Sequence, residues 1–258
     1  MKIIKSKDNP IYKAAARLTR KKYRDEEGLY MLEGIKPLED ALAMGIGIKN
    51  IFLCEGAESK CNFPENITIT LGKKLFQSIS ETQNSQGVIA VAEKKKYSQE
   101  SFAAEAAKGS GNVVVLDRLQ DPGNIGTIIR TAEAAGYRGI VIVSGSGDVY
   151  APKVVRAAAG SIFRIPIIYT KNGEQTVQML RSLDKKIVTT CMNSDVYYDK
   201  VDLTKNIALV IGNEGQGVSE EIMNSSDIKI KIPMEGSIES LNAAVAAGIL
   251  MYQSQKIN

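Results

Sequence analysis

The feature that most constrains this sequence is a regular alternation of apolar runs and helical segments from residue 112 onward. Runs rich in Val and Ile occur at residues 112–117, 138–145, 162–168, 185–191, 207–212 and 228–233. Helical patterns lie between them at residues 123–136 and 152–160, and after them at about 238–252. Because the runs are continuously apolar, they predict parallel strands that are buried on both faces. We therefore expect residues 105–258 to form a doubly wound α/β domain.

Residues 1–104 are expected to form a separate, smaller α/β domain. Asn9 and Pro10 are typical of a helix start, and this helix is predicted to end near Lys22. Its predicted apolar stripe consists of Ile11, Ala14, Ala15 and Leu18. Strands are predicted at 29–34, 48–54, 66–70 and 87–93, with helices at about 35–44 and at 73–79. The polar stretch 93–112 is interpreted as a linker that carries one short helix.

Positive charge is concentrated at the N-terminus. Residues 1–24 contain nine Lys or Arg residues and one acid, a net charge of +8 in a chain whose total is +4. A basic arm of this kind suits a polyanion such as nucleic acid, although a solvated helix face gives the same pattern. The residues predicted to contact RNA are Lys13, Arg17, Arg20, Lys21 and Arg24.

The composition also excludes several kinds of chemistry. The chain has no histidine, which removes the commonest general base and every Ser-His-Asp triad. Cys54, Cys61 and Cys191 form no CxxC pair, so we expect no metal site and reduced thiols, as in a cytosolic protein. No apolar run reaches 18 residues and the N-terminus does not resemble a secretory signal. We therefore predict a cytoplasmic protein without a membrane partner.

The first candidate motif joins a strand to a helix at residues 121–136. The strand ends at Asp117, and Pro122-Gly123-Asn124 then leads into the helix, whose free N–H groups favour an anion. Asn124 and Arg130, near the first two turns, could hold a ribose hydroxyl and a phosphate. The alternative is a capping asparagine and a surface arginine.

The second and third motifs are a glycine-rich loop and an Ala-rich helix. Gly212, Glu214 and Gly217 follow an apolar strand, where glycines let the backbone approach a ligand or simply form a tight turn. The loop fits neither GxGxxG nor a P-loop, and Glu214 suits a hydroxyl or amine better than a phosphate. In the third motif, 232–253, Ser240 is the predicted N-cap, and the Ala/Gly stripe after Asn242 predicts close packing against another backbone.

Taken in order, the three segments resemble the SpoU (TrmH-like) methyltransferases of the SPOUT superfamily. The family pattern N-x-x-x-x-x-R-T is similar to Asn124 through Thr131, and G-x-E-x-x-G to Gly212 through Gly217. I-P-M followed by S-L-N is similar to residues 232–234 and 240–242. The resemblance covers residues 112–256, and the N-terminal region looks like the small substrate-binding domain of many family members.

The resemblance implies a homodimer with a C-terminal trefoil knot that binds S-adenosylmethionine. The positions that correspond to the cofactor site are Thr190, Cys191, Gly212, Ile232 and Leu241. The implied reaction is attack of a ribose 2′-hydroxyl on the sulfonium methyl. We hypothesise that in this reaction Arg130 clamps a phosphate, Asn124 orients the ribose and Asn242 supports the site, while Glu214 or water accepts the proton.

Several alternatives remain open from the sequence. A SPOUT protein that methylates a base is disfavoured, because Asn124 and Arg130 match the ribose-modifying pattern. A catalytically silent RNA-binding assembly protein is disfavoured by the complete set of motifs, and an unrelated nucleotide-binding enzyme is a third possibility. Ribosomal RNA is preferred over transfer RNA as the substrate, on the basis of the N-terminal domain and the basic arm.

Overall fold

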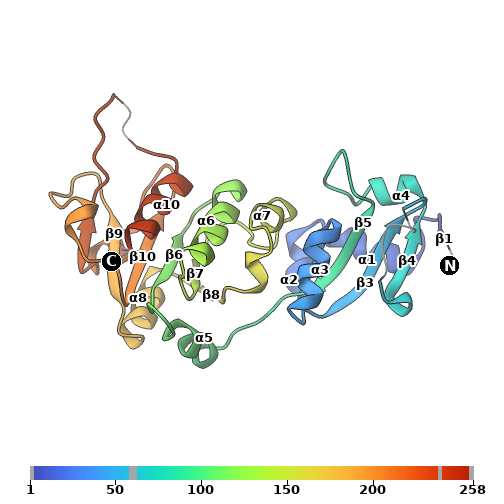
Figure 1. The fold of residues 1–258 in the computed structure, drawn as a ribbon, viewed down its shortest axis with the longest axis horizontal. Helices are drawn as coiled ribbons and strands as arrows, with labels where there is room; N and C mark the ends of the chain where they lie inside the picture. Colours follow the sequence, from blue (N-terminus) through green and yellow to red (C-terminus); the bar gives the residue numbers. More distant parts are fainter. Residues whose placement is uncertain (1–2, 58–62, 238–239, 256–258) are drawn as a thin grey trace. The chain divides into compact units, whose positions relative to one another are not determined.

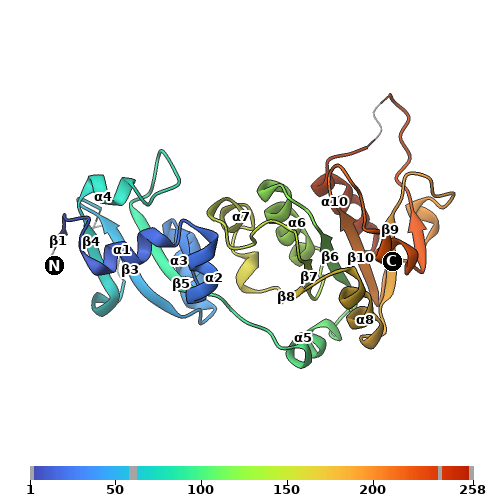
Figure 2. The same cartoon turned by 180° about the vertical axis from the view of Figure 1, so that it is seen from behind.

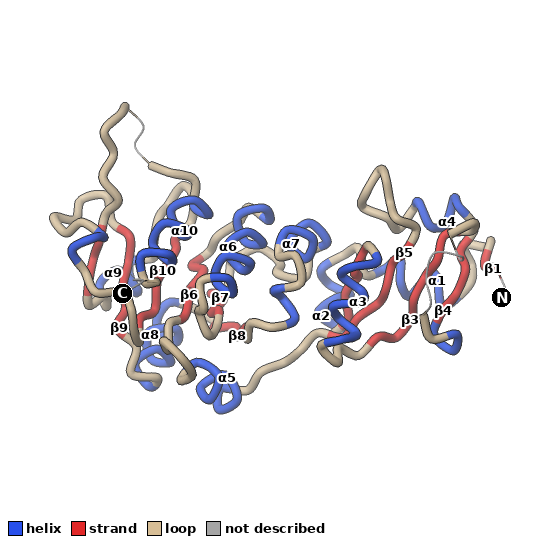
Figure 3. Tube along the Cα trace, viewed as in Figure 1, coloured by secondary structure: helices blue, strands red, loops and turns tan. Residues whose placement is uncertain are grey.

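The protein folds into two compact units. The computed structural model describes residues 3–57, 63–237 and 240–255, so Cys61 and residues 238–239 of the predicted last helix lie outside the described residues. The N-terminal unit contains Met1–Lys95 together with Asp148–Phe163, and the C-terminal unit contains Lys96–Gly147 together with Arg164–Asn258. Figure 1 shows their elements coloured along the chain, and Figure 3 distinguishes helices from strands.

The C-terminal unit is built on a parallel sheet. Its described strands are ordered β11-β9-β10-β6-β7-β8, and all neighbours run in parallel. Their bounds are β6 Val113–Asp117, β7 Ile140–Val143, β8 Ile167–Thr170, β9 Lys186–Thr190, β10 Ile207–Gly212 and β11 Ile228–Ile230. The doubly wound parallel sheet predicted from the apolar runs is confirmed, and the carboxyl ends of its strands meet at one edge.

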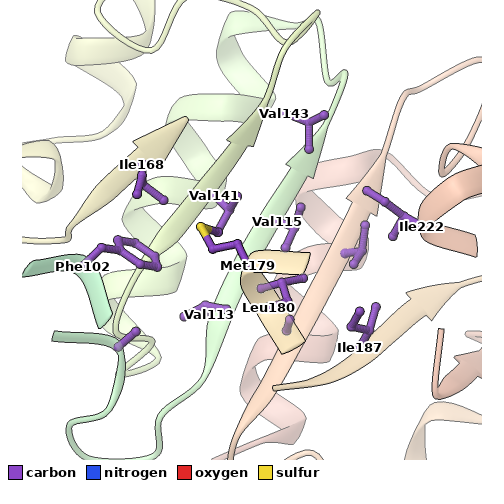
Figure 4. Packing of buried hydrophobic residues seen from close by; sticks show 13 residues of the cluster. Phe102, Val113, Val115, Val141, Val143, Ile168, Met179, Leu180, Ile187 and Ile222 are labelled. Atoms are coloured by element: carbon purple, nitrogen blue, oxygen red, sulfur yellow. The ribbon is translucent and has the colours of Figure 1, made fainter. Parts of the chain in front are cut away.

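Helices cover the sheet on both faces. The helices of this unit are α5 Gln99–Ala106, α6 Pro122–Ala134, α8 Gly173–Ser182, α9 Glu220–Asn224 and α10 Ala243–Gln253, with a 3₁₀ turn at Tyr198–Lys200. On one face, Phe102 of α5, Met179 of α8 and Ile222 of α9 pack against Val115 and Val141 of the sheet (Figure 4). On the other face, α6 and α10 lie side by side in both views (Figures 1 and 2).

Helix α10 begins later than the sequence predicts. Its N-cap is Asn242 and not Ser240, because the Asn242 side-chain oxygen accepts hydrogen bonds from the N–H groups of Ala244 and Val245. Ala244 and Ala247 of the predicted small-residue stripe are buried. The small side chains therefore serve the packing of α10, whose neighbour on the sheet is α6.

The N-terminal unit has a mixed sheet in the order β1-β4-β3-β5-β2. Its strands are β1 Ile3–Ile4, β2 Leu29–Glu33, β3 Ile48–Cys54, β4 Thr68–Leu71 and β5 Val88–Glu93. Its helices are α1 Pro10–Arg17, α2 Lys21–Glu27, α3 Ile35–Ala43, α4 Lys73–Gln77 and α7 Pro152–Ala157, with 3₁₀ turns at Glu65–Ile67 and Ser161–Phe163. Side chains of α1 and α4 share one hydrophobic cluster with Phe52 and Ile89 of the sheet.

The predicted first helix is divided into two. Asn9 caps α1 as expected, but α1 ends at Arg17 and α2 begins at Lys21 after an extended Arg20. The buried stripe of α1 consists of Tyr12, Ala15 and Leu18, whereas Ile11 is 40% exposed. The predicted stripe is therefore confirmed at Ala15 and Leu18 and wrong at Ile11 and Ala14, which are exposed, because Tyr12 fills the core in place of Ile11.

The division of the chain also differs from the predicted boundary at residues 104 and 105. That boundary falls inside α5, and Phe102 and Ala106 of α5 are buried in the core of the C-terminal unit. The helix therefore belongs to that unit and is not part of a linker. The predicted strand 162–168 is a 3₁₀ turn followed by β8, and α8 is an element that the sequence pattern missed.

Candidate active site at the carboxyl edge of the parallel sheet

The strand order creates a switch point between β6 and β10. From β6 the chain moves outward through β7 to β8, and it then returns to the other side of β6 as β9, β10 and β11. In open α/β sheets, ligands bind outside the carboxyl ends of the strands at such a point. The turn after β6 and the loop after β10 therefore form the candidate site.

Asn124 lies at the start of α6 and is 8% exposed. The helix is capped by Asp121, whose carboxylate accepts the Asn124 N–H at 2.8 Å, so the Asn124 side chain is free for other contacts. Its Nδ2 donates to Oε1 of Glu214 at 3.2 Å, and its Oδ1 accepts a hydrogen bond from Nδ2 of Asn242 at 2.9 Å. One residue from each predicted motif thus meets in a single hydrogen-bonded chain.

Glu214 joins its loop to the turn that precedes α6. Its carboxylate accepts the N–H groups of Gln120 at 3.2 Å and Asp121 at 3.0 Å, in addition to the Asn124 amide. Burial by itself would raise the pKa of Glu214, but these backbone and side-chain hydrogen bonds outweigh it and lower the pKa below the usual value. Glu214 is therefore held as a carboxylate and is a weak proton acceptor.

The glycine-rich loop is a tight, internally bonded turn. Asn213 and Gly217 exchange backbone hydrogen bonds of 2.9 Å each, and Gly217 has a φ of 70°. A Cβ on Gly212 would collide with the backbone of Gly217 and Val218. Position 212 therefore requires a glycine because the backbone of the same loop passes close to it. The predicted contact of Gly212 with the cofactor stays a prediction.

Arg130 does not join this network. Its side chain is exposed, and within the described parts of the chain it has no hydrogen bond or ion pair. Six residues after Asn124 on the same helix, it lies about 120° around the axis from Asn124. The structure therefore places the amide inside the site and leaves the guanidinium available to a molecule from outside.

The predicted cofactor residues lie around the ends of three neighbouring strands. Thr190 pairs with Ile230 at the ends of β9 and β11, and the Cys191 N–H donates to the Ile230 carbonyl. Ile232 and Leu241, like Thr190 and Cys191, are half-buried. From Ile232 to Ser237, the backbone makes no hydrogen bond with another described residue. Free backbone polar groups beside half-buried aliphatic side chains fit a ligand that combines a flat ring with polar atoms.

The N-terminal basic residues are only partly available. Lys13, Arg17, Arg20 and Lys21 are exposed, as an RNA-contacting role requires. Lys13 lies 2.7 Å from Asp8, Lys21 lies 2.5 Å from Asp25, and the Arg17 guanidinium lies 5.5 Å from the centre of the Tyr23 ring. Neighbouring acidic residues therefore reduce the positive electrostatic potential of the basic segment.

Arg24 is a correction to the predicted RNA-binding set. It is 4% exposed. Its Nε donates to Oδ2 of Asp148 at 2.8 Å, and its Nη1 donates to the Leu18 carbonyl at 2.6 Å. A buried guanidinium that is neutralised in this way holds α2 to the 148–163 segment of the same unit and cannot reach RNA.

Asp117 and Arg118 are site residues that sequence reasoning missed. Asp117 ends β6 with no exposure, and its Oδ2 accepts the Ser219 N–H at 2.6 Å. Arg118 follows with a φ of 58° and donates from Nη1 to Oε1 of Gln216 at 3.3 Å. The available signal was an acid, Asp117, within a strand predicted to be buried on both faces, because an Asp is seldom fully buried unless it is paired.

Among the described residues, no group of His, Cys, Asp and Glu side chains has the arrangement of a metal site. Within the same part of the chain, every helix is too short or too polar to cross a bilayer.

The fold and the site define a methyltransferase of the SpoU type. Residues 111–252 match the SpoU rRNA Methylase family, and residues 9–90 match the MRM3-like substrate binding domain. The protein therefore belongs to the SpoU rRNA methylase family, as the three sequence motifs predicted. The second match confirms the expected substrate-binding domain, which precedes the strands of the parallel sheet in the sequence.

Named relatives resemble the chain over nearly its whole length. The 23S rRNA (guanosine(2553)-2'-O)-methyltransferase RlmP of Bacillus subtilis is 33% identical over 98% of both chains. The structure of an AdoMet-bound rRNA methyltransferase from Sinorhizobium meliloti matches with a TM-score of 0.87 at 34% identity, covering 99% of this chain and 97% of that one. AviRb from Streptomyces viridochromogenes, in complex with AdoMet, has a TM-score of 0.81 at 26% identity over 95% and 97% of the two chains.

Proposed function

We propose that this protein is an S-adenosylmethionine-dependent methyltransferase that methylates a ribose 2′-hydroxyl of ribosomal RNA. The observation that carries the proposal is the hydrogen-bonded chain from Glu214 through Asn124 to Asn242, which joins all three family motifs at the switch point of the sheet. The full-length similarity to a 23S rRNA 2'-O-methyltransferase supports both the reaction and the preference for ribosomal over transfer RNA.

The cofactor site consists of Thr190, Cys191, Gly212, Ile232 and Leu241. The uncommitted backbone groups after β11 and the half-buried aliphatic side chains suit a nucleoside with an amino-acid tail. S-adenosylmethionine, when bound, supplies a methyl group that is already activated as a sulfonium. The protein is left to place the nucleophile in line and to favour loss of its proton.

Arg130 clamps a phosphate of the RNA next to the reacting ribose. Its guanidinium stays protonated in ordinary protein sites, so it acts through charge and not as a base. A fixed positive charge beside the ribose lowers the pKa of the 2′-hydroxyl. Asn124 orients that ribose, and Asn242 holds Asn124 in place through its 2.9 Å hydrogen bond.

Glu214 is a positioning residue in this scheme. Its carboxylate already accepts three N–H groups, and its pKa is below the usual value, so a proton from the ribose is better accepted by water. The part of Glu214 is to fix the turn before α6 relative to the glycine-rich loop.

The protein acts as a cytoplasmic homodimer with a knotted C-terminus. The apolar residues Val245 and Tyr252 are seven positions apart on α10 and are 52% and 56% exposed, which suits a face covered by a second copy. The crossing of the segment after β10 through an earlier loop belongs to the fold of the family. Lys13, Arg17, Arg20 and Lys21 contribute to RNA binding in the N-terminal unit.

Labelled S-adenosylmethionine and total RNA provide the test. Incubation with the purified protein is expected to label ribosomal RNA, and nuclease digestion is expected to recover the label on a ribose 2′-oxygen. Label on a base, on transfer RNA alone or on nothing would contradict the proposal. Dimer formation is measured separately by sedimentation, and Val245→Glu is expected to weaken it.

A further inference from the structure

We propose that Arg118 binds a phosphodiester group of the RNA substrate at the active site, in addition to the phosphate contact assigned to Arg130. The inference rests on the proposed function and deepens it by adding an RNA contact that the three motifs do not contain. Arg118 lies in the turn between β6 and α6, and this turn is interlocked with the glycine-rich loop.

The backbone of Arg118 is held in an unfavourable conformation. Its φ of 58° lies in the left-handed region, which glycine and asparagine adopt far more readily than arginine. Its carbonyl accepts a 2.9 Å hydrogen bond from Nδ2 of Asn213, which fixes the turn. Strained residues of this kind persist where the surrounding structure imposes them, and they gather at functional sites. We therefore infer that the arginine is kept at this strained position because its side chain has a function.

The Arg118 side chain is anchored at one end and available at the other. Its Nε lies 3.4 Å from Oδ1 of the fully buried Asp117, and Nη1 donates to Gln216 at 3.3 Å. A guanidinium has five N–H donors, and Nη2 has no partner among the described residues. The side chain is 35% exposed although its Nε is buried, so part of its surface remains accessible from solvent.

The position favours an RNA phosphate over the cofactor. Arg118 follows β6, whereas Thr190, at the end of β9, and Ile232, after β11, belong to strands on the far side of β10 in the strand order. Gly212, at the end of β10, is the predicted cofactor residue that pairs with Asp117 of β6. Asn124, assigned to the ribose, lies six residues after Arg118 on the same turn and helix. An oriented guanidinium matches the geometry of a phosphodiester and positions the backbone without reading a base.

The competing role is that of a counter-ion for Asp117. Asp117 Oδ1 is buried and has no hydrogen-bond partner, so Arg118 could serve only to neutralise it. A phosphate contact and a counter-ion predict different RNA affinities for a variant that lacks both charges. Arg118→Gly relieves the backbone strain but leaves Asp117 unpaired, whereas Asp117→Asn with Arg118→Gly removes both problems and still lacks the guanidinium.

The experiment measures the binding of purified ribosomal RNA to the full-length protein at several salt concentrations. Arg118→Gly and the double variant are both expected to bind about tenfold more weakly and to lower the salt dependence by about one counter-ion. The Kd for S-adenosylmethionine is expected to stay unchanged. Arg138→Gln, which removes an exposed charge at the amino edge of the sheet, is the matched control and is expected to change neither quantity.

Three results would overturn the assignment. Wild-type RNA affinity in both variants excludes a phosphate contact, and recovery of affinity in the double variant makes Arg118 a counter-ion only. A selective loss of S-adenosylmethionine affinity would show that Arg118 contacts the cofactor and not an RNA phosphate. Because RNA binding is measured apart from methyl transfer, a protein that binds RNA through Arg118 but labels no ribose would contradict the proposed function and not this inference.

Discussion

The amino and carboxyl edges of the C-terminal sheet use buried polar side chains in different ways. At the amino edge, Lys185 donates to the carbonyls of Ala106 and Gly111 at 2.9 and 2.6 Å. At the carboxyl edge, Asn124 bonds to the side chains of Glu214 and Asn242. Lys185 thus joins two backbone segments at the amino edge. At the carboxyl edge, the hydrogen bonds fix side chains relative to one another.

We infer from this difference that the amino edge contributes mainly to stability and the carboxyl edge mainly to catalysis. Removal of a buried side chain that donates to two backbone carbonyls leaves both carbonyls without a partner, so its loss is expected to affect folding. The carboxyl edge keeps Arg130, part of Arg118 and the backbone after β11 uncommitted within the described residues, so changes there are expected to affect turnover. Variants at the two edges test this division.

The largest effect is expected for Arg130→Lys. A lysine keeps the charge but loses the planar, two-point geometry for phosphate, so we expect kcat/KM to fall about 100-fold. The unfolding free energy is expected to stay within about 0.5 kcal/mol, because Arg130 is exposed. Methyl transfer and urea unfolding measure the two quantities, with Arg138→Lys as the control at the opposite edge. Near-normal turnover would refute the clamp.

Next in size is Lys185→Met at the amino edge. The change leaves the carbonyls of Ala106 and Gly111 without their donor, so we expect a loss of about 1–3 kcal/mol in unfolding free energy. The kcat of the folded protein is expected to be unchanged. A fall in kcat without loss of stability would break the proposed division between the edges.

The same residue predicts a dependence of stability on pH. Burial lowers the pKa of Lys185 below its ordinary value of 10.5. The unfolded chain therefore binds this proton more tightly than the folded one, and the unfolding free energy contributed by Lys185 rises with pH from the folded pKa up to about 10.5. Urea titrations from about pH 8 to pH 10.5 are expected to show this rise in the wild type and a flatter profile in Lys185→Met.

A smaller effect is expected for Asn124→Asp. The new carboxyl lies beside Glu214, and two like charges at hydrogen-bond distance raise each other's pKa. We expect kcat to fall about tenfold near neutral pH and to recover in part at lower pH, where the introduced carboxyl is protonated and can again donate to Glu214. A pH–rate profile parallel to that of the wild type would contradict the network.

The smallest effect is expected for Glu214→Gln. Because the pKa of Glu214 is lowered in the folded protein, its stabilisation is present above the ordinary Glu value and is lost as the pH falls through the folded pKa. Glu214 is an exposed residue, so the effect on stability is expected to stay below about 1 kcal/mol. Acid unfolding is expected to be less steep in the variant, and equal slopes would assign the acid sensitivity to other carboxylates.

Much of the fold followed from local sequence patterns. The apolar runs located five of the six strands of the C-terminal sheet in the described residues and overlapped the start of β8, because a strand buried on both faces leaves an uninterrupted run of β-branched side chains. The pattern failed where tertiary packing decided. It merged α1 and α2 into one helix, and it assigned α5 to a linker although Phe102 is buried in the core.

The sequence by itself determined the parallel sheet and the residue types of the three motifs, because periodicity and spacing are properties of the chain. Only the tertiary structure decided how these residues meet. Asn124 and Asn242 are 118 positions apart, and their hydrogen bond exists only because α6 and α10 pack side by side. Burial, likewise a property of the folded molecule, removed Arg24 from the RNA-binding set and revealed Arg118 as the partner of a buried Asp117.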